Sequence, residues 1–293
     1  MAKLFSENKF KEALPIAAKV VELRRSAVGD RDISTGKAYR NLAYVQLGAG
    51  KTGDAIGSFE KAITIYSAQA ALGDASRDEL GSMLERLGYI RFDGGRDRDA
   101  IDLFTKAAEQ RRIRYGENST HTAGSVWALA NVYFLTKDYK NAESNFWRVV
   151  LIRSVIDPWS WETADAEGRY LCTAKKNGNG EGLESKIRAL KNSAAKTDET
   201  FRIINGGVVN GKAKYLRRPE YPVVARHAVP TGRVSVTVTI DETGKVIFAC
   251  ASDGNKVFWD AVEQAAYGSL FEPTTLEGKP VKVKGRIEYQ FSY

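Results

Sequence analysis

The residues able to do chemistry are few and scattered along the chain. It contains two cysteines, Cys172 and Cys250, and two histidines, His121 and His227. A thiol nucleophile needs a base within hydrogen-bond reach, and nothing in the sequence brings these four side chains together. We interpret His121 as a residue at the start of a helix and His227 as the end of a short helical segment. Neither is predicted to be catalytic.

Two segments have some features of ligand-binding loops. "NGNGEG" (177–182) is rich in glycine, but it follows a helical pattern instead of a strand, which does not fit a phosphate-binding loop. "DGGRDRDAID" (93–102) has spaced acidic residues but lacks the central glycine of a calcium loop. We therefore expect no enzyme, no cofactor and no metal site.

The two cysteines lie 78 positions apart, in segments that we assign to different domains. Their spacing does not match that of metal ligands. A disulfide between them is possible, but we do not expect one across a domain boundary. The cysteines therefore say little about the redox compartment.

The chain is basic, with a net charge of +8 over 293 residues. Acidic residues are interleaved with the basic ones almost everywhere, whereas a nucleic-acid site needs a clustered basic stripe. We expect no nucleic-acid partner. The nearest cluster is interpreted as a solvated flank and consists of Lys212, Lys214, Arg217, Arg218 and Arg226.

The elements that position these residues begin with a repeat. Four segments align with one another, at alanines spaced by 42, 45 and 42 residues: Ala13, Ala55, Ala100 and Ala142. Periods of this size indicate stacked supersecondary units. A second helical pattern precedes each of the last three segments ("GKAYRNLAYVQLGAG", "DELGSMLERLGYIRF", "GSVWALANVYFLTKD"). Each unit is therefore predicted to be a helix pair.

These pairs resemble tetratricopeptide repeats. The first helices carry small residues at Ala43, Gly88 and Ala130, and the second helices carry Phe59, Phe104 and Phe146 after the alanines. The period exceeds the usual 34 residues, and we expect the extra residues to lengthen the second helices, as in the repeats of kinesin light chains. The resemblance covers residues 9 to about 156, with a more polar helix pair from Trp161 to Asn192 as a capping unit.

The array is expected to begin inside a repeat. The partner helix of the segment around Ala13 would reach back before Met1, and only its last turn, "AKLFSE", is present. Terminal repeats normally cover the apolar face of an array. We therefore expect the chain to be a fragment or to lack an upstream segment. It has no run of about 20 apolar residues, so membrane association is expected only through partners or an upstream anchor.

The first helices of such arrays line a concave surface. A groove there would bind a peptide, with aromatic and arginine side chains as anchors. The alternative is that these side chains only pack repeats together. The predicted groove residues are Lys37, Arg40, Tyr44, Glu85, Tyr89, Trp127, Asn131 and Phe134.

The pattern changes near residue 200. Residues 192–200 are small and polar, and "FRIINGGVVNGKA" reads as two short strands. Strand alternation at 233–240 and in "KVIFACAS" predicts a hairpin, 256–268 a helix, and 281–293 a last strand. We therefore predict two domains: an all-α solenoid at 1–195, a linker at 196–200, and a small α+β domain at 201–293 with one helix packed on an antiparallel sheet.

The second domain resembles the TonB C-terminal domain family over about 201–293. The marks are "PEYPVVAR", Gly232-x-Val234-x-Val236, Gly244-x-Val246, "WDAVEQAA", "FEP" and "GKPVKVKGRIEYQF". In that family the domain lies in the periplasm and adds a strand from an outer-membrane transporter, transmitting force from an inner-membrane complex. The chain departs from the pattern, because it has no membrane helix, no Pro-rich spacer, and Arg218 where a Gln is usual.

The resemblance implies a noncatalytic protein-interaction protein of the bacterial cell envelope, located in the periplasm. Its partners would be proteins or peptides, with outer-membrane TonB-dependent transporters as one class. We expect the last strand to be the sheet edge that accepts a partner. The alternative is a helical-repeat adaptor whose C-terminal domain is structural. The predicted partner-binding residues of this domain are Arg218, Pro219, Tyr221, Pro222, Lys282, Lys284 and Arg286.

Overall fold

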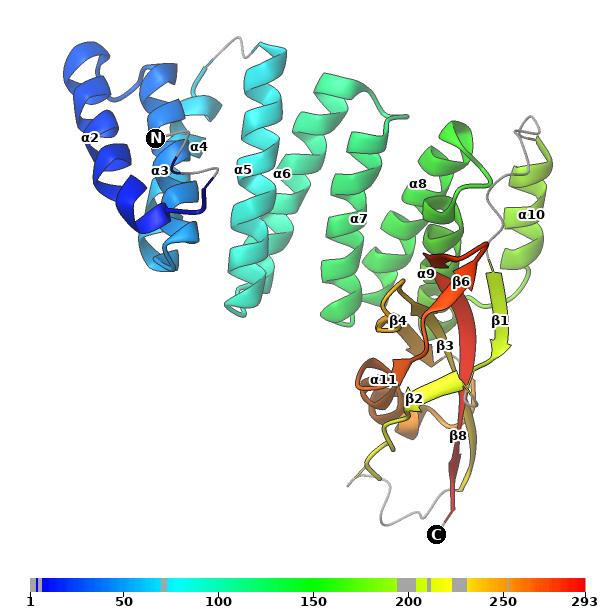
Figure 1. Ribbon diagram of the computed structural model, residues 1–293. Coiled ribbons are helices and arrows are strands. Elements are labelled where there is room, and N and C mark those ends of the chain that lie inside the picture. The colour runs from blue at the N-terminus through cyan, green and yellow to red at the C-terminus, as the bar shows by residue number, and fades with distance from the viewer. Residues whose placement is uncertain are drawn as a thin grey trace. The chain divides into compact units, whose positions relative to one another are not determined.

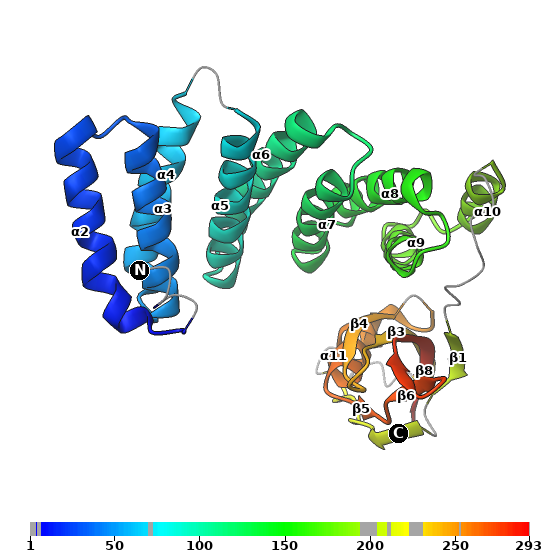
Figure 2. The ribbon, with the colours of Figure 1, turned by 45° about the horizontal axis from the view of Figure 1, so that its top comes forward.

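The computed structural model describes residues 4, 7–69, 73–193, 204–209, 212–222, 231–251 and 253–292. The chain forms two compact units, Met1–Ile156 and Asp157–Tyr293, each of which is described by itself (Figures 1 and 2). The predicted linker at 196–200 and the short helix after Pro222, with Arg226 and His227, lie outside the described residues. The predicted domain boundaries at 195 and 201 stay a prediction.

The first unit is built from antiparallel helices that run from blue to green in Figure 1. Its helices are α2 (Phe10–Val28), α3 (Ile33–Gly48), α4 (Thr52–Ser67), α5 (Asp74–Asp93), α6 (Asp97–Tyr115), α7 (Thr120–Leu135) and α8 (Tyr139–Ile156). The predicted helix pairs are confirmed, with α3, α5 and α7 as first helices and α2, α4, α6 and α8 as second helices. No described helix combines the length and the apolar character needed to span a membrane.

Small residues let the two helices of a pair approach closely. A Cβ added at Gly88 of α5 would lie 3.1 Å from the ring of Phe104 in α6. Ala43 and Ala130 hold the same position in α3 and α7, and both are fully buried. Phe104 therefore fills the space that Gly88 leaves, and Phe59 and Phe146 hold the same position in α4 and α8.

The same turn joins α2 to α3 and α6 to α7. Gly29 and Gly116 adopt positive φ angles of 86° and 81°, which end the preceding helices. Ser119 caps α7 by accepting a hydrogen bond from the Thr122 amide, and the Thr122 hydroxyl donates to the Gly116 carbonyl at 2.7 Å. Asp32 plays the same capping role for α3. The repeat is therefore encoded in its turns as well as in its core.

The prediction that extra residues lengthen the second helices holds only in part. Helix α6 reaches Tyr115 and has 19 residues, but α4 has 16 and ends at Ser67. The 20-residue α5 begins at Asp74, so part of the longer step between these two repeats lies in a first helix.

The second unit combines three described α-helices with a sheet. After α9 (Trp161–Lys176) and α10 (Leu183–Ser193), the four-stranded sheet has the order β1-β8-β3-β4. Two small two-stranded sheets, β2-β5 and β6-β7, accompany it. The strands and the last helix are β1 (Ile204–Val208), β2 (Ala213–Tyr215), β3 (Gly232–Ile240), β4 (Val246–Ala251), α11 (Trp259–Tyr267), β5 (Leu270–Phe271), β6 (Thr274–Leu276), β7 (Lys279–Val281) and β8 (Val283–Phe291).

The predicted hairpin and packed helix are confirmed. Strands β3 and β4 are antiparallel, and the apolar residues of one sheet face pack against α11. At the end of β8, the Phe291 ring stacks on Phe258 with centroids 3.8 Å apart, and Tyr221 packs edge-on against both rings. Tyr221 of the predicted proline motif is therefore part of this core.

The prediction that the last strand is an edge of the sheet is wrong. Strand β8 lies between β3, which pairs antiparallel with it along its length, and β1, which pairs parallel with it from Val283 to Arg286. Glycines allow this parallel pairing: a Cβ at Gly206 would lie 2.8 Å from Val283, and one at Gly285 would lie 2.5 Å from Val209. The sheet is thus mixed, and its edge strands are β1 and β4.

Candidate interaction surfaces

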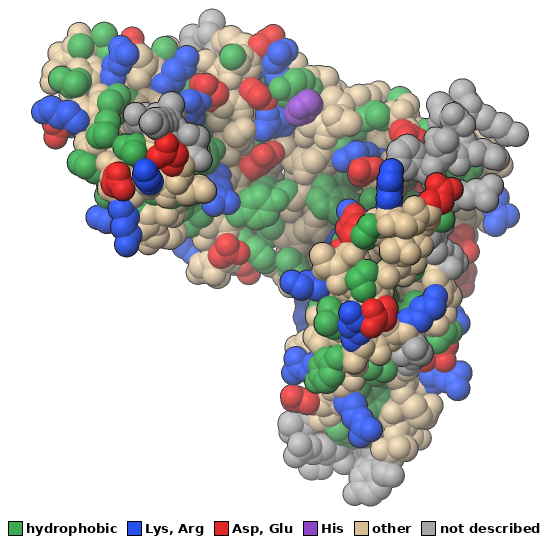
Figure 3. Space-filling model, viewed as in Figure 1, with side chains coloured by type: hydrophobic (Ala, Val, Ile, Leu, Met, Phe, Trp, Pro, Cys, Tyr) green, Lys and Arg blue, Asp and Glu red, His purple; other side chains and the backbone are tan. Residues whose placement is uncertain are grey.

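The predicted groove residues all lie on the first helices of the repeats. Lys37, Arg40 and Tyr44 belong to α3, Glu85 and Tyr89 to α5, and Trp127, Asn131 and Phe134 to α7. On the face seen in Figure 3, hydrophobic side chains gather over α5 and α7, with charged side chains around them. The first unit therefore presents a mixed apolar and charged surface on its first helices.

The aromatic residues of this surface are half-buried. Tyr44 packs edge-on against Phe59 with ring centroids 5.1 Å apart, and Tyr89 packs in the same way against Phe104 at 4.8 Å. Tyr89 nevertheless keeps 47% of its surface exposed. Burial raises the pKa of both tyrosines, so their hydroxyls stay neutral hydrogen-bond donors. These rings support the repeat core and still present a face to solvent.

The charged residues of the surface connect successive repeats. Arg40 of α3 forms a salt bridge with Glu79 of α5. One repeat further on, Glu85 of α5 accepts a hydrogen bond from the Ser125 hydroxyl of α7 and lies 3.6 Å from Arg111. Arg40 and Glu85 thus have a packing role between repeats. Their role in binding a peptide, like that of the other six residues, stays a prediction.

In the second unit, a disulfide joins α9 to the sheet, and our expectation of no such bond is wrong. Cys172 of α9 is bonded to Cys250 of β4, with Cα atoms 6.2 Å apart. The expectation failed because α9 was assigned only to the repeat array. In the structure α9 packs on the sheet face opposite α11, so that the two cysteines meet.

Cationic side chains strengthen the contact between α9 and the sheet. Arg169 of α9 lies over the Phe248 ring of β4 at 4.3 Å, and Lys176 forms a 2.7 Å salt bridge with Glu263 of α11. On the strand side, Lys282 lies over the ring of Trp161. These contacts were not predicted from the sequence. The one available signal was the cysteine on each side of the interface.

Lys284 is a partly buried cation of this interface. Its amine donates a hydrogen bond to the Ala164 carbonyl of α9. Burial lowers the pKa of Lys284, although Asp165 and Glu167 oppose this and Lys191 and Arg169 add to it. The predicted alternation is confirmed, since Lys284 points away from the apolar set of β8. It lies beneath α9, however, instead of keeping a free edge soluble.

The β4 edge of the sheet is covered by side chains of α11. The Ala251 amide donates to the Glu263 carboxylate at 2.8 Å, and Tyr267 hydrogen-bonds the backbone of Ala249. Because these groups occupy outward amides of β4, this edge resists pairing with another strand.

The edge formed by β1 covers only part of its neighbour β8. The pairing of β1 with β8 stops at Val208 opposite Arg286, whereas β8 continues to Phe291. The Val209 amide donates to the Arg286 carbonyl, so the backbone of Arg286 faces β1. Peptide groups alternate along a strand, and the backbone of Gln290 therefore faces the same side.

The proline motif lies at this end of β8. The Tyr221 ring is 6.0 Å from the Phe291 ring, Pro219 and Pro222 are half-buried, and Arg218 is exposed. The structure thus brings the motif to the C-terminal half of β8, whereas Lys282 and Lys284 lie at the other half, beneath α9.

The predicted helix-start histidine and a lysine of the basic flank contact neighbouring side chains. His121 is the second residue of α7, as predicted, and stacks on Tyr115 at 3.9 Å. Lys214 of the basic flank pairs with Glu272 at 3.0 Å. Within the described residues, no group of three His, Cys, Asp or Glu side chains is placed to hold a metal ion.

The fold defines a two-part protein, a helical-repeat solenoid followed by a small module with one helix on its sheet. Residues 4–68 match the family model of the tetratricopeptide repeat. Residues 217–292 match the model described as Gram-negative bacterial TonB protein C-terminal. Both resemblances are thereby confirmed, and both kinds of domain support a protein-interaction role. None of the curated proteins compared with the chain matches it.

Solved structures agree with the repeat fold. TPR-like repeats of a Podosopora anserina protein described as a kinesin light chain give a TM-score of 0.51 at 14% identity, covering 67% of this chain and 93% of that one. The apo form of RapI gives 0.50 at 15% identity, covering 66% and 52% of the two chains. At these identities the likeness concerns the fold alone.

Removing the disulfide is expected to destabilise the second unit. The bond closes a loop across 78 positions, and losing such a bond typically costs about 2–4 kcal/mol. We expect the free energy of unfolding of C172A/C250A, measured by urea titration, to fall by about this amount. A reducing agent should lower the stability of the wild-type chain and leave that of the variant unchanged. Equal stability of both chains without reductant would contradict a structural role.

Replacing Lys284 by Met should stabilise the second unit at neutral pH, because it removes a buried charge. The pKa of Lys284 is lower in the folded than in the unfolded state, so the wild-type chain gains stability as pH rises between that lowered value and about 10.4. The difference in free energy of unfolding between Lys284→Met and the wild-type chain, measured by urea titration, should therefore be smaller at pH 10 than at pH 7. Lys279→Met, at an exposed position, is the control. A constant advantage would refute the burial argument.

Proposed function

We propose that the protein is a noncatalytic interaction protein of the bacterial cell envelope, in which the C-terminal module binds one partner by strand addition and the repeats bind another. The observation that carries the proposal is the match of residues 217–292 to the TonB C-terminal model. The resemblance implies a partner of the outer-membrane transporter class.

The geometry favours the C-terminal half of β8 as the site of strand addition. Strand β1 stops opposite Arg286, and the Gln290 backbone faces the side on which β1 has ended. The β4 edge is covered by Glu263 and Tyr267. An added strand would continue the line of β1 along Tyr289–Phe291, next to Tyr221. This placement replaces the whole-strand edge expected from the sequence.

The disulfide supports the proposed location in the periplasm. Disulfides form and persist in oxidising surroundings such as the bacterial periplasm and are rare in the cytosol. The Cys172–Cys250 bond is buried between α9 and β4, and both cysteines are at most 5% exposed. In the periplasm this bond would persist and keep α9 joined to β4.

A second candidate function is a helical-repeat adaptor with a structural C-terminal module. The observation that favours it is the extent of the α9 contact, in which a disulfide, a salt bridge and two cation–π contacts attach the module to the helix after the third repeat. In that case all partners would bind the first-helix surface around Tyr89.

Strand addition predicts a position-specific effect of proline. Gln290→Pro removes the amide that faces the incoming strand and leaves the β3 ladder paired, since the Gln290 peptide groups point away from β3. We expect the full chain to recover outer-membrane transporters from envelope extract, Gln290→Ala to do the same, and Gln290→Pro to lose them. The measurement is affinity capture with mass spectrometry.

Two other outcomes separate the candidates. Recovery of transporters by Gln290→Pro would refute strand addition at this site. If Tyr89→Ala alone loses the partners, the repeat-adaptor function replaces the proposal. A circular dichroism spectrum like that of the wild-type chain is the folding control for each variant.

The proposed compartment predicts an oxidised pair in living cells. When cells are quenched with acid and treated with a maleimide, Cys172 and Cys250 should stay unlabelled until a reductant is added, because both sulfurs are in the disulfide. The measurement is the mass of the captured chain. Full labelling without reductant would place the protein in a reducing compartment.

A further inference from the structure

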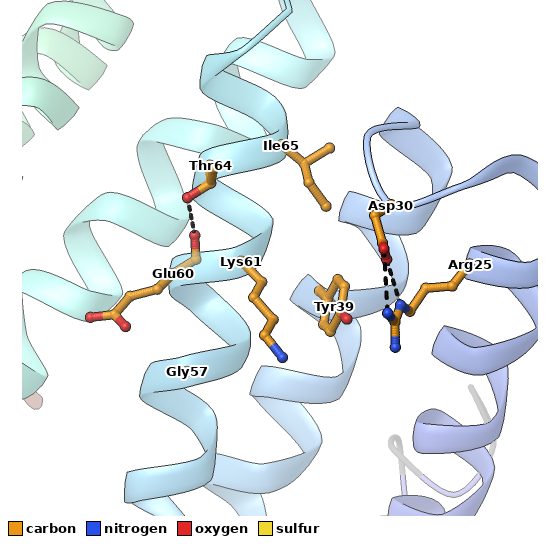
Figure 4. A pocket seen from close by; sticks show the side chains of 8 residues that line it. All are labelled: Arg25, Asp30, Tyr39, Gly57, Glu60, Lys61, Thr64 and Ile65. Carbon is orange, nitrogen blue, oxygen red and sulfur yellow. Dashed lines mark hydrogen bonds and ion pairs between the residues drawn. The ribbon is translucent and has the colours of Figure 1, made fainter.

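A cleft of about 470 Å³ opens on the second-helix side of the first unit, between α2, α3 and α4 (Figure 4). Two of its three helices, α2 and α4, are second helices, so it is separate from the surface formed by Tyr44 and Tyr89 on the first helices. Its lining consists of Arg25, Asp30, Tyr39, Gly57, Glu60, Lys61, Thr64 and Ile65.

Lys61 points into this cleft without a counter-charge in contact with it. Its amine lies 5.3 Å from the centroid of the Tyr39 ring, and within the described part of the chain no carboxylate forms a salt bridge with it. Asp30 acts on Lys61 only at longer range, because both its oxygens bind Arg25, at 2.5 and 3.3 Å. Glu60 turns away from Lys61 in Figure 4 and pairs with Arg91.

The equivalent cations in the next two repeats are paired. Six residues after the last three repeat alanines stand Lys61 in α4, Lys106 in α6 and Arg148 in α8. Lys106 binds Asp102 one turn earlier at 2.6 Å, and Arg148 binds Glu117 at 2.7 Å.

The repeat formed by α3 and α4 differs at both carboxylate positions. Gly57 stands where α6 has Asp102, and the shorter Asp30 stands where the α6–α7 turn has Glu117. Because Gly57 has no side chain, it also leaves room in the cleft. A Cβ added at Gly57 would meet no atom within 4 Å. The repeat formed by α3 and α4 thus has the cation of this position and a space beside it, but among the described residues no carboxylate contacts that cation.

We propose that this cleft binds a carboxylate side chain of an acidic protein segment, which pairs with Lys61 while the aliphatic part of that segment packs on Tyr39 and Ile65. The chemistry is set by charge complementarity: Lys61 is the cation, Arg25 with its own Asp30 borders the site, and the aromatic floor suits a methylene chain. The site lies in the repeats and is independent of strand addition by the C-terminal module.

The test uses the isotope-labelled full chain and two synthetic peptides, acetyl-Gly-Ser-Glu-Leu-Gly-amide and its Gln analogue. Titration is followed through the NMR amide signals of Thr64 and Ile65, which line the cleft. We expect the Glu peptide to bind at least about fivefold more tightly than the Gln peptide, with an affinity that falls as salt is raised.

Four variants locate the effect. Lys61→Gln should remove the preference for the Glu peptide, whereas Lys106→Gln, at the equivalent and already paired position, should keep it. Gly57→Asp restores the spacing of Asp102 and Lys106 and should also abolish binding, because it supplies the missing anion within the helix. Gly57→Ala fills the same position without a charge and should keep the preference.

Three results would overturn the proposal. Equal affinity for the two peptides would show that no carboxylate is recognised. Undiminished binding by Lys61→Gln or by Gly57→Asp would remove Lys61 from the site. An equal loss in Lys106→Gln would assign the effect to the overall positive charge.

Discussion

The sheet of the second unit has two faces, and both have to be covered for the unit to be compact. Helix α11 has nine residues and covers one face. The other face carries Phe248, Cys250 and Lys284, and α9 covers it. The disulfide, the cation–π contacts and the buried amine all follow from this single requirement, since each lies where α9 meets the strands. A helix that sequence periodicity assigns to the repeats is therefore part of the core of the C-terminal module.

The first unit depends on a different constraint, the contact between a small residue of one helix and a phenylalanine of the next. The small residue and the phenylalanine recur in the three helix pairs from α3 to α8, whereas positions outside them vary in charge and size. At one such position the cation is retained as Lys61 and Lys106, whereas the residue four positions before it is Gly57 in α4 and Asp102 in α6. The repeats thus share one core and differ in the chemistry of their outer faces.

Periodicity and turn chemistry predict most of this architecture. The alanine spacing gives the helix pairs, and the alternation around Val236 gives the hairpin, because in both cases the contacts that fix the element are close in sequence. The parallel pairing of β1 with β8 joins residues about 80 positions apart, and no local pattern reports it. The disulfide was missed for the same reason: the fold of α9 onto β4 depends on a tertiary contact. The periodicity assigns the predicted groove residues to the first helices. It does not report that Arg40 pairs with Glu79 or that Glu85 lies near Arg111, because each pair joins two different helices.

The coverage of the sheet also limits how the module can meet a partner. One face is closed by α11, the other by α9, and the β4 edge by Glu263 and Tyr267. The proposed strand addition would therefore have to use the β1 side, where β8 extends beyond β1 and the Tyr221 ring packs against Phe291. Because a disulfide holds α9 in place, a partner that required the α9 face would first need a reductant. The proposed strand addition beside Gln290 would not need one.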